Sequence, residues 1–439
     1  MIREIEKSLM DRVPEHKLRP RLEPTRRAVE LLGDPQKMYR VVHITGTNGK
    51  TTTTRIIERI LREFGLRTGR FTSPHLIELN ERIAIDGEPI AIERLYEVFK
   101  DIEPVLEIVD QELLAEAESR LTFFEALAVL GFACFADAPV DVLVLEVGMG
   151  GEWDSTNVAD GDVAVFTPID LDHMERLGNT ISEIATTKSG IIKPISAVVS
   201  SKQQPEALEV LKQKANSTGQ SFDVYGDSFT VTEVIEDATG LTFSISSLAG
   251  EYKNLFMPLH GKYQVENAAV AIAAIEQFMG SAAEVLPDEI LRAALADVTS
   301  PGRLQVISKN PVILLDAAHN PHGARSLADA LVHSFDSPEA IGVISILGDK
   351  DARGVLEALE PVLTEIILTQ STSSRATALG DLLPLAEEIF GVERVKHKAN
   401  AREAIDEAKN RVGSGGIVVV SGSITLIGDV LKLKQLEEI

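Results

Sequence analysis

Residues 39–63 read YRVVHITGTNGKTTTTRIIERILRE, and this stretch decides the fold of the region around it. The apolar segment 41–44 is typical of a buried strand, and residues 55–63 have the apolar spacing of an amphipathic helix. Between them, Gly46 and Gly49 permit a tight turn, and the amides that begin the helix point toward an anion. Lys50 would neutralise phosphate charge, and the Thr51 hydroxyl can ligate the magnesium of a nucleotide. The stretch therefore predicts a strand, a phosphate-binding loop and a helix.

The loop is a variant of the strict phosphate-loop pattern, because Ile44 occupies the position of its first glycine. A glycine-rich turn before a helix can simply connect two elements without binding a ligand. A Gly-Lys-Thr run between an apolar strand and an amphipathic helix instead favours nucleotide binding. We therefore expect the nucleotide to be bound by Gly46, Thr47, Asn48, Gly49, Lys50 and Thr51.

Composition limits the classes of partner. The chain has 439 residues, of which 44% are hydrophobic and 25% charged, so it is long enough for two or more domains. Its formal net charge of -24 argues against nucleic acid or an acidic membrane as a partner. Cys134 is the single cysteine and lies in an apolar run, which indicates a buried residue and excludes a disulfide framework. With no signal core and no membrane-spanning run, we expect a cytoplasmic monomer that acts on small molecules.

Polar side chains follow two buried strands of the same region. Glu146 lies near the far end of the apolar segment 140–148, and glycines at 148, 150 and 151 would let backbone approach a ligand closely. His173 follows the next apolar segment, 162–167. A strand-end glutamate is usually a solvated edge residue and a lone histidine is usually structural. Two consecutive strands that deliver such side chains toward one edge favour a metal site instead.

The later chain changes pattern twice. A capped helix from Ser182 contains Lys188, which in isolation would be a solvated cation on a helix. Short strands are expected within residues 222–257, and an alanine-rich helix opens at residues 260–267. Residues 299–303 form the best linker, after which alternating strands and helices restart. This series predicts a second doubly wound α/β domain.

The motifs together resemble folylpolyglutamate synthase/dihydrofolate synthase of the Mur ligase superfamily, in order along nearly the whole chain. The matching segments are residues 45–50, 72–76, 81–83, 145–151, 172–173, 177–178, 188–191, 316–321 and 422–423. The resemblance implies a phosphate-loop, Mur ligase-like ATP-binding domain with a folate pocket over residues 1–297. It also implies a smaller Rossmann-like glutamate ligase domain over residues 298–439, with the active site in the cleft between them.

The resemblance implies amide ligation driven by ATP and Mg2+, in which an acid is activated as an acyl phosphate and attacked by L-glutamate. Lys50, Lys188, His173 and His319 would be catalytic, with His319 at the glutamate end. Ser73, Glu146, His173, Thr51 and a carbamylated Lys188 would hold the metal. Asn267, Arg303 and Asp316 would hold ATP, so that both domains clasp it. Thr122, Trp153, Asp154 and Ser155 would line the dihydropteroate pocket.

The expected reaction is addition of L-glutamate to dihydropteroate, to reduced folates, or to both. Three departures from the family pattern bear on this expectation: Thr51-Thr52 after the loop lysine, Glu152-Trp153 after the paired glycines, and Thr187 and Ser189 around Lys188. The first is closer to cell-wall Mur ligases, which are the alternative within the superfamily, although those enzymes carry a whole domain before the loop. From another class, a phosphate-loop kinase or a nucleotide-gated binding module stays possible on the loop alone.

Overall fold

The computed structural model describes residues 1–14, 20–280, 282–335, 339–413 and 415–437, and the chain divides into two compact units. Unit 1 comprises residues 1–233, 243–256 and 265–298; unit 2 comprises residues 234–242, 257–264 and 299–439. Segments 234–242 and 257–264 fall within the predicted first domain of residues 1–297, whereas in the structure they belong to unit 2.

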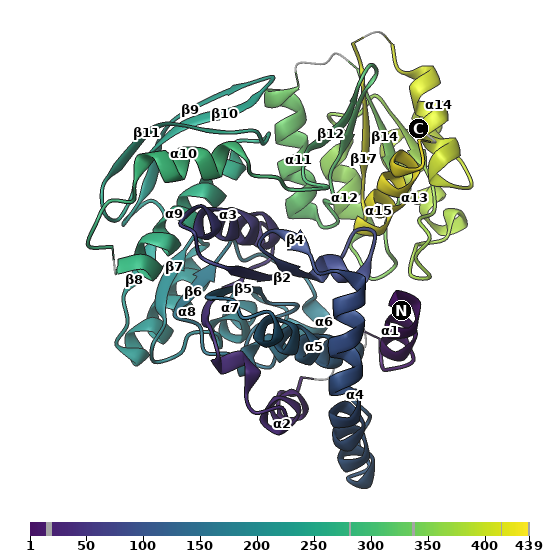
Figure 1. Cartoon of the computed structure of the whole chain (residues 1–439). Helices are drawn as coiled ribbons and strands as arrows, with labels where there is room; N and C mark the ends of the chain where they lie inside the picture. The colour runs from purple at the N-terminus through teal and green to yellow at the C-terminus, as the bar shows by residue number, and fades with distance from the viewer. Residues whose placement is uncertain (15–19, 281, 336–338, 414, 438–439) are drawn as a thin grey trace. The chain divides into compact units, whose positions relative to one another are not determined.

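Unit 1 is built on an eight-stranded sheet of order β4-β3-β2-β5-β1-β6-β7-β8 (Figure 1). Its strands are β1 (Arg40–Thr45), β2 (Thr68–Phe71), β3 (Ile83–Ile85), β4 (Glu88–Pro89), β5 (Val142–Glu146), β6 (Val163–Phe166), β7 (Ala197–Ser200) and β8 (Phe222–Val224). Neighbours from β2 to β8 pair in parallel, and β3 and β4 add an antiparallel hairpin at the Asp86-Gly87 turn. Every residue of β5 is buried, as expected for a parallel strand covered on both faces.

Helices cover the two faces of this sheet. One apolar core joins α1 (Ile2–Met10), α2 (Glu23–Leu31), α4 (Ile92–Ala115) and α5 (Phe123–Asp137) to β1, β2 and β5. A second core joins α7 (Ile181–Ser189) and α8 (Pro205–Thr218) to β6 and β7. Helix α3 (Lys50–Glu63) packs against α10 (Asp288–Ala296) on the face opposite to α5 and α7 (Figure 1). The remaining elements are α6 (Met174–Leu177), α9 (Tyr263–Gly280) and a sheet of β9 (Thr230–Asp237), β10 (Gly240–Ser246) and β11 (Glu251–Met257).

Unit 2 carries a six-stranded sheet of order β12-β13-β17-β14-β15-β16. Its strands are β12 (Gln305–Lys309), β13 (Val312–Leu315), β14 (Ala340–Ile344), β15 (Glu365–Leu368), β16 (Val395–His397) and β17 (Ile417–Ser421). Only β12, among these, pairs antiparallel. One face packs on α11 (Pro321–Ser334), α12 (Ala352–Leu359) and α13 (Leu379–Phe390), and α14 (Ala401–Arg411) and α15 (Ile424–Gln435) complete the unit. The predicted α/β class, with a phosphate-loop domain and a Rossmann-like domain, is confirmed.

In the part of the chain that the structure describes, no helix is both long enough and apolar enough to cross a bilayer.

Candidate active site

The phosphate-loop stretch forms the strand, turn and helix that its sequence predicts. The backbone turns at Gly46 (φ 149°) and Gly49 (φ 88°) between β1 and α3. A β-carbon at Gly46 would lie 1.9 Å from Thr167 Oγ1, and one at Gly49 would lie 2.8 Å from Asn267 Oδ1. Both glycines are therefore required by space as well as by backbone angle. Ile44, which replaces the usual first glycine, is a fully buried residue of β1.

Neighbouring loops hold the phosphate loop at three points. Thr47 N donates to Pro168 O at 2.8 Å, and Thr47 Oγ1 donates to Asp170 O at 3.0 Å. Thr45 Oγ1 donates to Gly150 O at 2.7 Å, which joins the loop after β5 to the end of β1. Neither Thr45 nor Asp170 was among the predicted site residues, although Thr45 begins the matching segment 45–50. Loops at the carboxyl ends of three parallel strands are thus linked to one another.

Two lysines approach the same carbonyl oxygen of the phosphate loop. Lys50 Nζ lies 3.1 Å from Gly46 O and 3.2 Å from Thr47 O. Lys188 Nζ, from α7, lies 2.8 Å from Gly46 O, and its side chain is 4% exposed. Burial and then the charge of Lys50 lower the pKa of Lys188 from 10.5 to about 7, against the opposing influence of Asp172 and Asp154. The alternative that Lys188 is a solvated helix cation is wrong, because α7 packs directly against the loop.

Glu146 and Thr51 are brought together at the centre of this edge. Thr51 Oγ1 lies 3.0 and 3.1 Å from the two carboxylate oxygens of Glu146, which is 1% exposed. The alternative of a solvated edge glutamate is therefore wrong. β1 lies between β5 and β6 in the sheet, so the strand that ends at Glu146 and the strand before His173 flank the strand before Thr51.

His173 and Ser73 lie on the loops that follow β6 and β2. His173 adopts a left-handed backbone conformation (φ 51°), in which a residue with a side chain is strained. Its amide donates to Asp172 Oδ1 at 2.8 Å. Ser73 is half-buried. Among the residues that the structure describes, no three His, Cys, Asp or Glu side chains gather as a metal site. A metal here would have to depend on hydroxyl groups or on a modified lysine in addition to Glu146 and His173.

The candidate acid-substrate residues have structural roles that their motif did not reveal. Asp154 is 3% exposed, and its carboxylate accepts hydrogen bonds from Met149 N, Thr156 N and Thr156 Oγ1. Thr122 has no exposed surface and caps α5 by accepting from Glu125 N. Ser155 is 3% exposed, whereas Trp153 is half-buried. Direct contact of Asp154 or Thr122 with a substrate stays a prediction, and it requires these groups to exchange a protein partner for the ligand.

The remaining candidates divide between the units. Asn267 belongs to unit 1 and lies against Gly49. Arg303, Asp316 and His319 belong to unit 2; Asp316 and His319 follow β13, and Arg303 precedes β12. Asp316 accepts from Leu304 N and Ala318 N, both at 2.9 Å, and burial raises its pKa although Arg303 opposes this shift. His319 Nδ1 lies 2.9 Å from Ala317 O.

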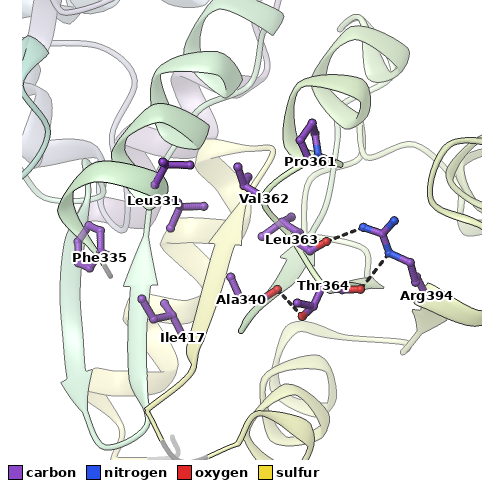
Figure 2. A pocket seen from close by; sticks show the side chains of 10 residues that line it. Leu331, Phe335, Ala340, Pro361, Val362, Leu363, Thr364, Arg394 and Ile417 are labelled. Carbon is purple, nitrogen blue, oxygen red and sulfur yellow. Dashed lines mark hydrogen bonds between the residues drawn. The ribbon is translucent and has the colours of Figure 1, made fainter. Parts of the chain in front are cut away.

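A second region of unit 2 is hollowed, at the opposite edge of its sheet from Asp316. A pocket of about 490 Å³ lies beside the beginnings of β14, β15 and β17. Figure 2 shows the side chains that line it. Its wall is largely apolar, with Leu331 from α11, Phe335 directly after that helix, and Val362 and Leu363 before β15. Arg394 is held there by the carbonyl oxygens of Thr364, Leu363 and Glu360 and by the Glu360 carboxylate. No sequence motif pointed to this pocket.

Comparisons with known proteins agree with this architecture. Residues 44–275 match the Mur ligase middle domain, and residues 302–424 match the glutamate ligase domain of Mur ligases. A phosphate loop at the carboxyl edge of a parallel sheet, followed by a Rossmann-like unit, thus defines an ATP-dependent ligase of the Mur type.

The relatives narrow this class to one family. The dihydrofolate synthase/folylpolyglutamate synthase of Mycobacterium tuberculosis is 40% identical, over 97% of this chain and 92% of its own length. The Bacillus subtilis protein of the same name is 33% identical, over 94% and 95%. The M. tuberculosis folylpolyglutamate synthase complexed with ADP and AMPPCP superposes with a TM-score of 0.92 at 39% identity, covering 98% of each chain. Escherichia coli FolC, solved with DHPP and ADP, gives 0.87 at 27% identity, over 99% of this chain and 98% of that one. The chain belongs to the dihydrofolate synthase/folylpolyglutamate synthase family.

Proposed function

We propose that this ligase joins L-glutamate both to dihydropteroate, forming dihydrofolate, and to reduced folates, lengthening their polyglutamate tail. The observation that carries the proposal is the convergence of Lys50 and Lys188 on Gly46 O, at the sheet edge that also holds the Thr51–Glu146 pair. The complexes of relatives with ADP, AMPPCP and DHPP support ATP and a pterin-type acid as ligands.

The substrate carboxylate must be activated before an amine can attack it, because a carboxylate is a poor electrophile. The substrate carboxylate attacks the γ-phosphorus of ATP, the bond from that phosphorus to the β–γ bridging oxygen breaks, and ADP leaves. The neutral amine of glutamate then attacks the acyl phosphate; the amide forms, inorganic phosphate leaves and the amine loses a proton. Lys50 would neutralise phosphate charge during transfer, and the loop amides would orient the phosphates.

The donor set at this edge fits a divalent cation of the Mg2+ type. Glu146 would supply a carboxylate, Thr51 and Ser73 hydroxyl oxygens, and His173 an imidazole nitrogen. Thr51 Oγ1 already lies within 3.1 Å of both Glu146 carboxylate oxygens, so both side chains could coordinate one ion. When bound, the cation would neutralise charge on the transferring phosphoryl group.

The environment of Lys188 supports a carbamate at its Nζ. An ammonium at this position is buried and faces a second cation, Lys50, across one carbonyl oxygen. The neutral amine can attack carbon dioxide, forming an N–C bond and releasing one proton, which leaves an anionic carbamate. The charge at the site changes sign, and an oxygen ligand is added to the metal set.

Depletion of bicarbonate tests the carbamate. Enzyme stripped of carbon dioxide should lose most of its activity and regain it when bicarbonate is added back. Mass spectrometry under native conditions should show the corresponding added mass in wild type and not in Lys188→Arg. Full activity without bicarbonate, or wild-type behaviour of Lys188→Arg, would refute the modification.

Residues 148–156, which follow β5, are proposed to border the acid substrate; we call this segment the acid loop. Trp153 offers a flat ring on which a pterin could stack. Ser155 and Thr122 are proposed to complete the pocket. The Asp154 carboxylate suits the adjacent donors of an amino-pyrimidine edge, in exchange for one of its present protein partners.

The nucleotide and glutamate assignments in the remaining chain are proposals of the same kind. Asn267, Arg303 and Asp316 are assigned to ATP, and His319 to glutamate. Substitution of the first three should raise the KM for ATP, and His319→Ala should raise the KM for glutamate. If the first three substitutions raised the KM for glutamate and His319→Ala raised the KM for ATP, the two assignments would be exchanged.

The decisive experiment supplies MgATP and L-glutamate with dihydropteroate, tetrahydrofolate or a muramoyl peptide in parallel, and measures phosphate release and product mass. Both pterin acids should be extended and the peptide should not. Elongation of tetrahydrofolate without dihydrofolate formation would reduce the function to tail elongation. Selective loss of dihydrofolate formation in Asp154→Ala would support the pocket.

A further inference from the structure

A buried polar chain connects the central strand of unit 1 to the acid loop. His43, in the middle of β1, has no exposed surface, and its Nε2 lies 2.9 Å from Thr156 Oγ1. Thr156 Oγ1 lies 2.5 Å from Asp154 Oδ1, and Thr156 N donates to the same oxygen at 2.9 Å. Asp154 Oδ2 accepts from Met149 N at 2.8 Å. Neither nucleotide binding nor metal binding uses His43 or Thr156.

Counting protons along this chain fixes its direction. A threonine hydroxyl has one proton, and Asp154 as a carboxylate can only accept. Thr156 therefore donates to Asp154 and must accept from His43, so the proton of His43 is on Nε2. This tautomer leaves a lone pair on Nδ1, which is buried and has no hydrogen-bond partner in the structure. Burial lowers the pKa of His43 to about 3, so the ring stays neutral.

The same face of β1 holds the acid loop at a second point. Thr45, two residues beyond His43, donates to Gly150 O at 2.7 Å. The loop then packs on α7: Glu152 N donates to Thr187 O at 2.8 Å, and a β-carbon at Gly151 would lie 2.7 Å from Lys188 O. The position of Trp153 therefore depends on contacts made by β1 on one side and by the Lys188 segment on the other.

A buried chain that contains a carboxylate and an unpartnered ring nitrogen stabilises a core less than apolar side chains of similar volume would. From His43 Nε2 to Asp154 the chain is hydrogen-bonded throughout, and satisfied buried networks specify one conformation among several that pack equally well. The chain ends at Asp154, between Trp153 and Ser155, so the conformation that it specifies is that of the acid loop.

We propose that His43 and Thr156 are positioning residues that hold the acid loop in the shape required by the pterin acid, and that they determine affinity for this substrate rather than for ATP. This inference rests on the proposed function for the identity of the acid. Neither residue touches the reacting atoms; both act through Asp154 and the backbone at Met149.

The test compares Thr156→Val, which removes the hydroxyl at nearly constant volume, with Thr156→Ser, which keeps it. For Thr156→Val we expect the KM for dihydropteroate to rise about tenfold, as for one lost hydrogen bond, with the KM for ATP within twofold of wild type. Thr156→Ser should restore the KM for dihydropteroate to within about threefold. Trp153 is the only tryptophan in the chain, so its emission without substrate should shift in Thr156→Val and not in Thr156→Ser.

His43→Leu provides a second route if Thr156→Val does not fold, because it removes both the donor and the unpartnered Nδ1 from the core. It should show the same selective rise in KM. An unchanged KM for dihydropteroate and unchanged Trp153 emission in the folded variant would overturn the proposal, as would equal rises in both KM values. Wild-type protein that extends no pterin acid would overturn the proposed function instead, and Trp153 emission would still decide whether the chain positions the loop.

Discussion

The carboxyl edge of the eight-stranded sheet and the amino edge of the six-stranded sheet each hold a cation against backbone carbonyl oxygens, in opposite electrostatic circumstances. At the first edge, Lys188 is buried beside a second cation, Lys50, at Gly46 O. At the second edge, Arg394 meets a carboxylate and three carbonyl oxygens of residues 360–364, near the end of α12. Figure 2 shows its contacts with Leu363 and Thr364. The fold neutralises the charge of Arg394 with a carboxylate and leaves Lys188 beside a second positive charge. Unfavourable electrostatics of this kind are typical of functional sites.

The largest effect is expected for Lys50→Ala. Removal of the loop charge should lower the turnover of ATP about a thousandfold, because phosphoryl transfer depends on neutralising the phosphates. Phosphate release measures the loss, and circular dichroism checks that the fold persists. The exposed Lys37→Ala should behave as wild type in both measurements. Retention of wild-type turnover in Lys50→Ala would remove the loop as the ATP site.

Lys188→Met should separate activity from stability. We expect ligation to fall at least about a hundredfold, while the unfolding free energy rises. The gap between a pKa of 10.5 in the unfolded chain and about 7 in the fold corresponds to roughly 4–5 kcal/mol for unmodified lysine.

The pH dependence of this stability difference has a definite sign. Below pH 7 both states of unmodified Lys188 are protonated and the cost is complete; between pH 7 and 10.5 the unfolded state binds more protons, so wild-type stability rises with pH. The advantage of Lys188→Met should therefore shrink as pH approaches 10.5, in urea titrations without bicarbonate. A pH-independent difference would contradict the charge argument.

Glu146→Ala and His173→Ala should each raise the Mg2+ concentration needed for half-maximal activity about 10–100-fold. Magnesium titration of initial rates provides the measurement. His173→Asn is a useful companion, since asparagine tolerates the left-handed backbone at this position and so separates strain from ligation. Titrations identical to wild type in both alanine variants would refute the metal assignment.

The smallest effect on catalysis is expected for Arg394→Ala. Loss of its contacts to residues 360–364 should lower the unfolding free energy by about 1–3 kcal/mol. Activity per folded molecule should stay within twofold. Thermal unfolding and phosphate release measure the two quantities, and a hundredfold loss of turnover without a stability change would reverse the comparison with Lys188.

The sequence predicted the elements whose patterns are local. The strand, loop and helix of residues 39–63 follow from apolar period and glycine placement, and the hairpin at Asp86-Gly87 follows from its turn residues. β12 and β16 are edge strands without a continuous apolar run, so apolar patterning does not reveal them. The inclusion of segments 234–242 and 257–264 in unit 2 depends on long-range packing that no local pattern records.

Within the site, the sequence indicated residue types more readily than their surroundings. Glu146 and Thr51 were named and do meet, because the carboxyl ends of parallel strands share one edge. The burial of Lys188 could not be read from its helix, since it depends on the contact between α7 and Gly46. The capping roles of Asp154 and Thr122 were likewise hidden, because the same side chains serve ligand recognition and helix capping equally well.

The three hydrogen bonds that hold the phosphate loop have a kinetic consequence. Thr45 and Thr47 hold the loop to residues 150, 168 and 170, so its backbone is already ordered when a nucleotide arrives. Nucleotide binding then costs little conformational entropy at the loop, because the loop is already complementary to the phosphates when they first make contact. Capture of the triphosphate by unit 1 should accordingly proceed at the rate of productive encounter, with no slower step of loop ordering after it.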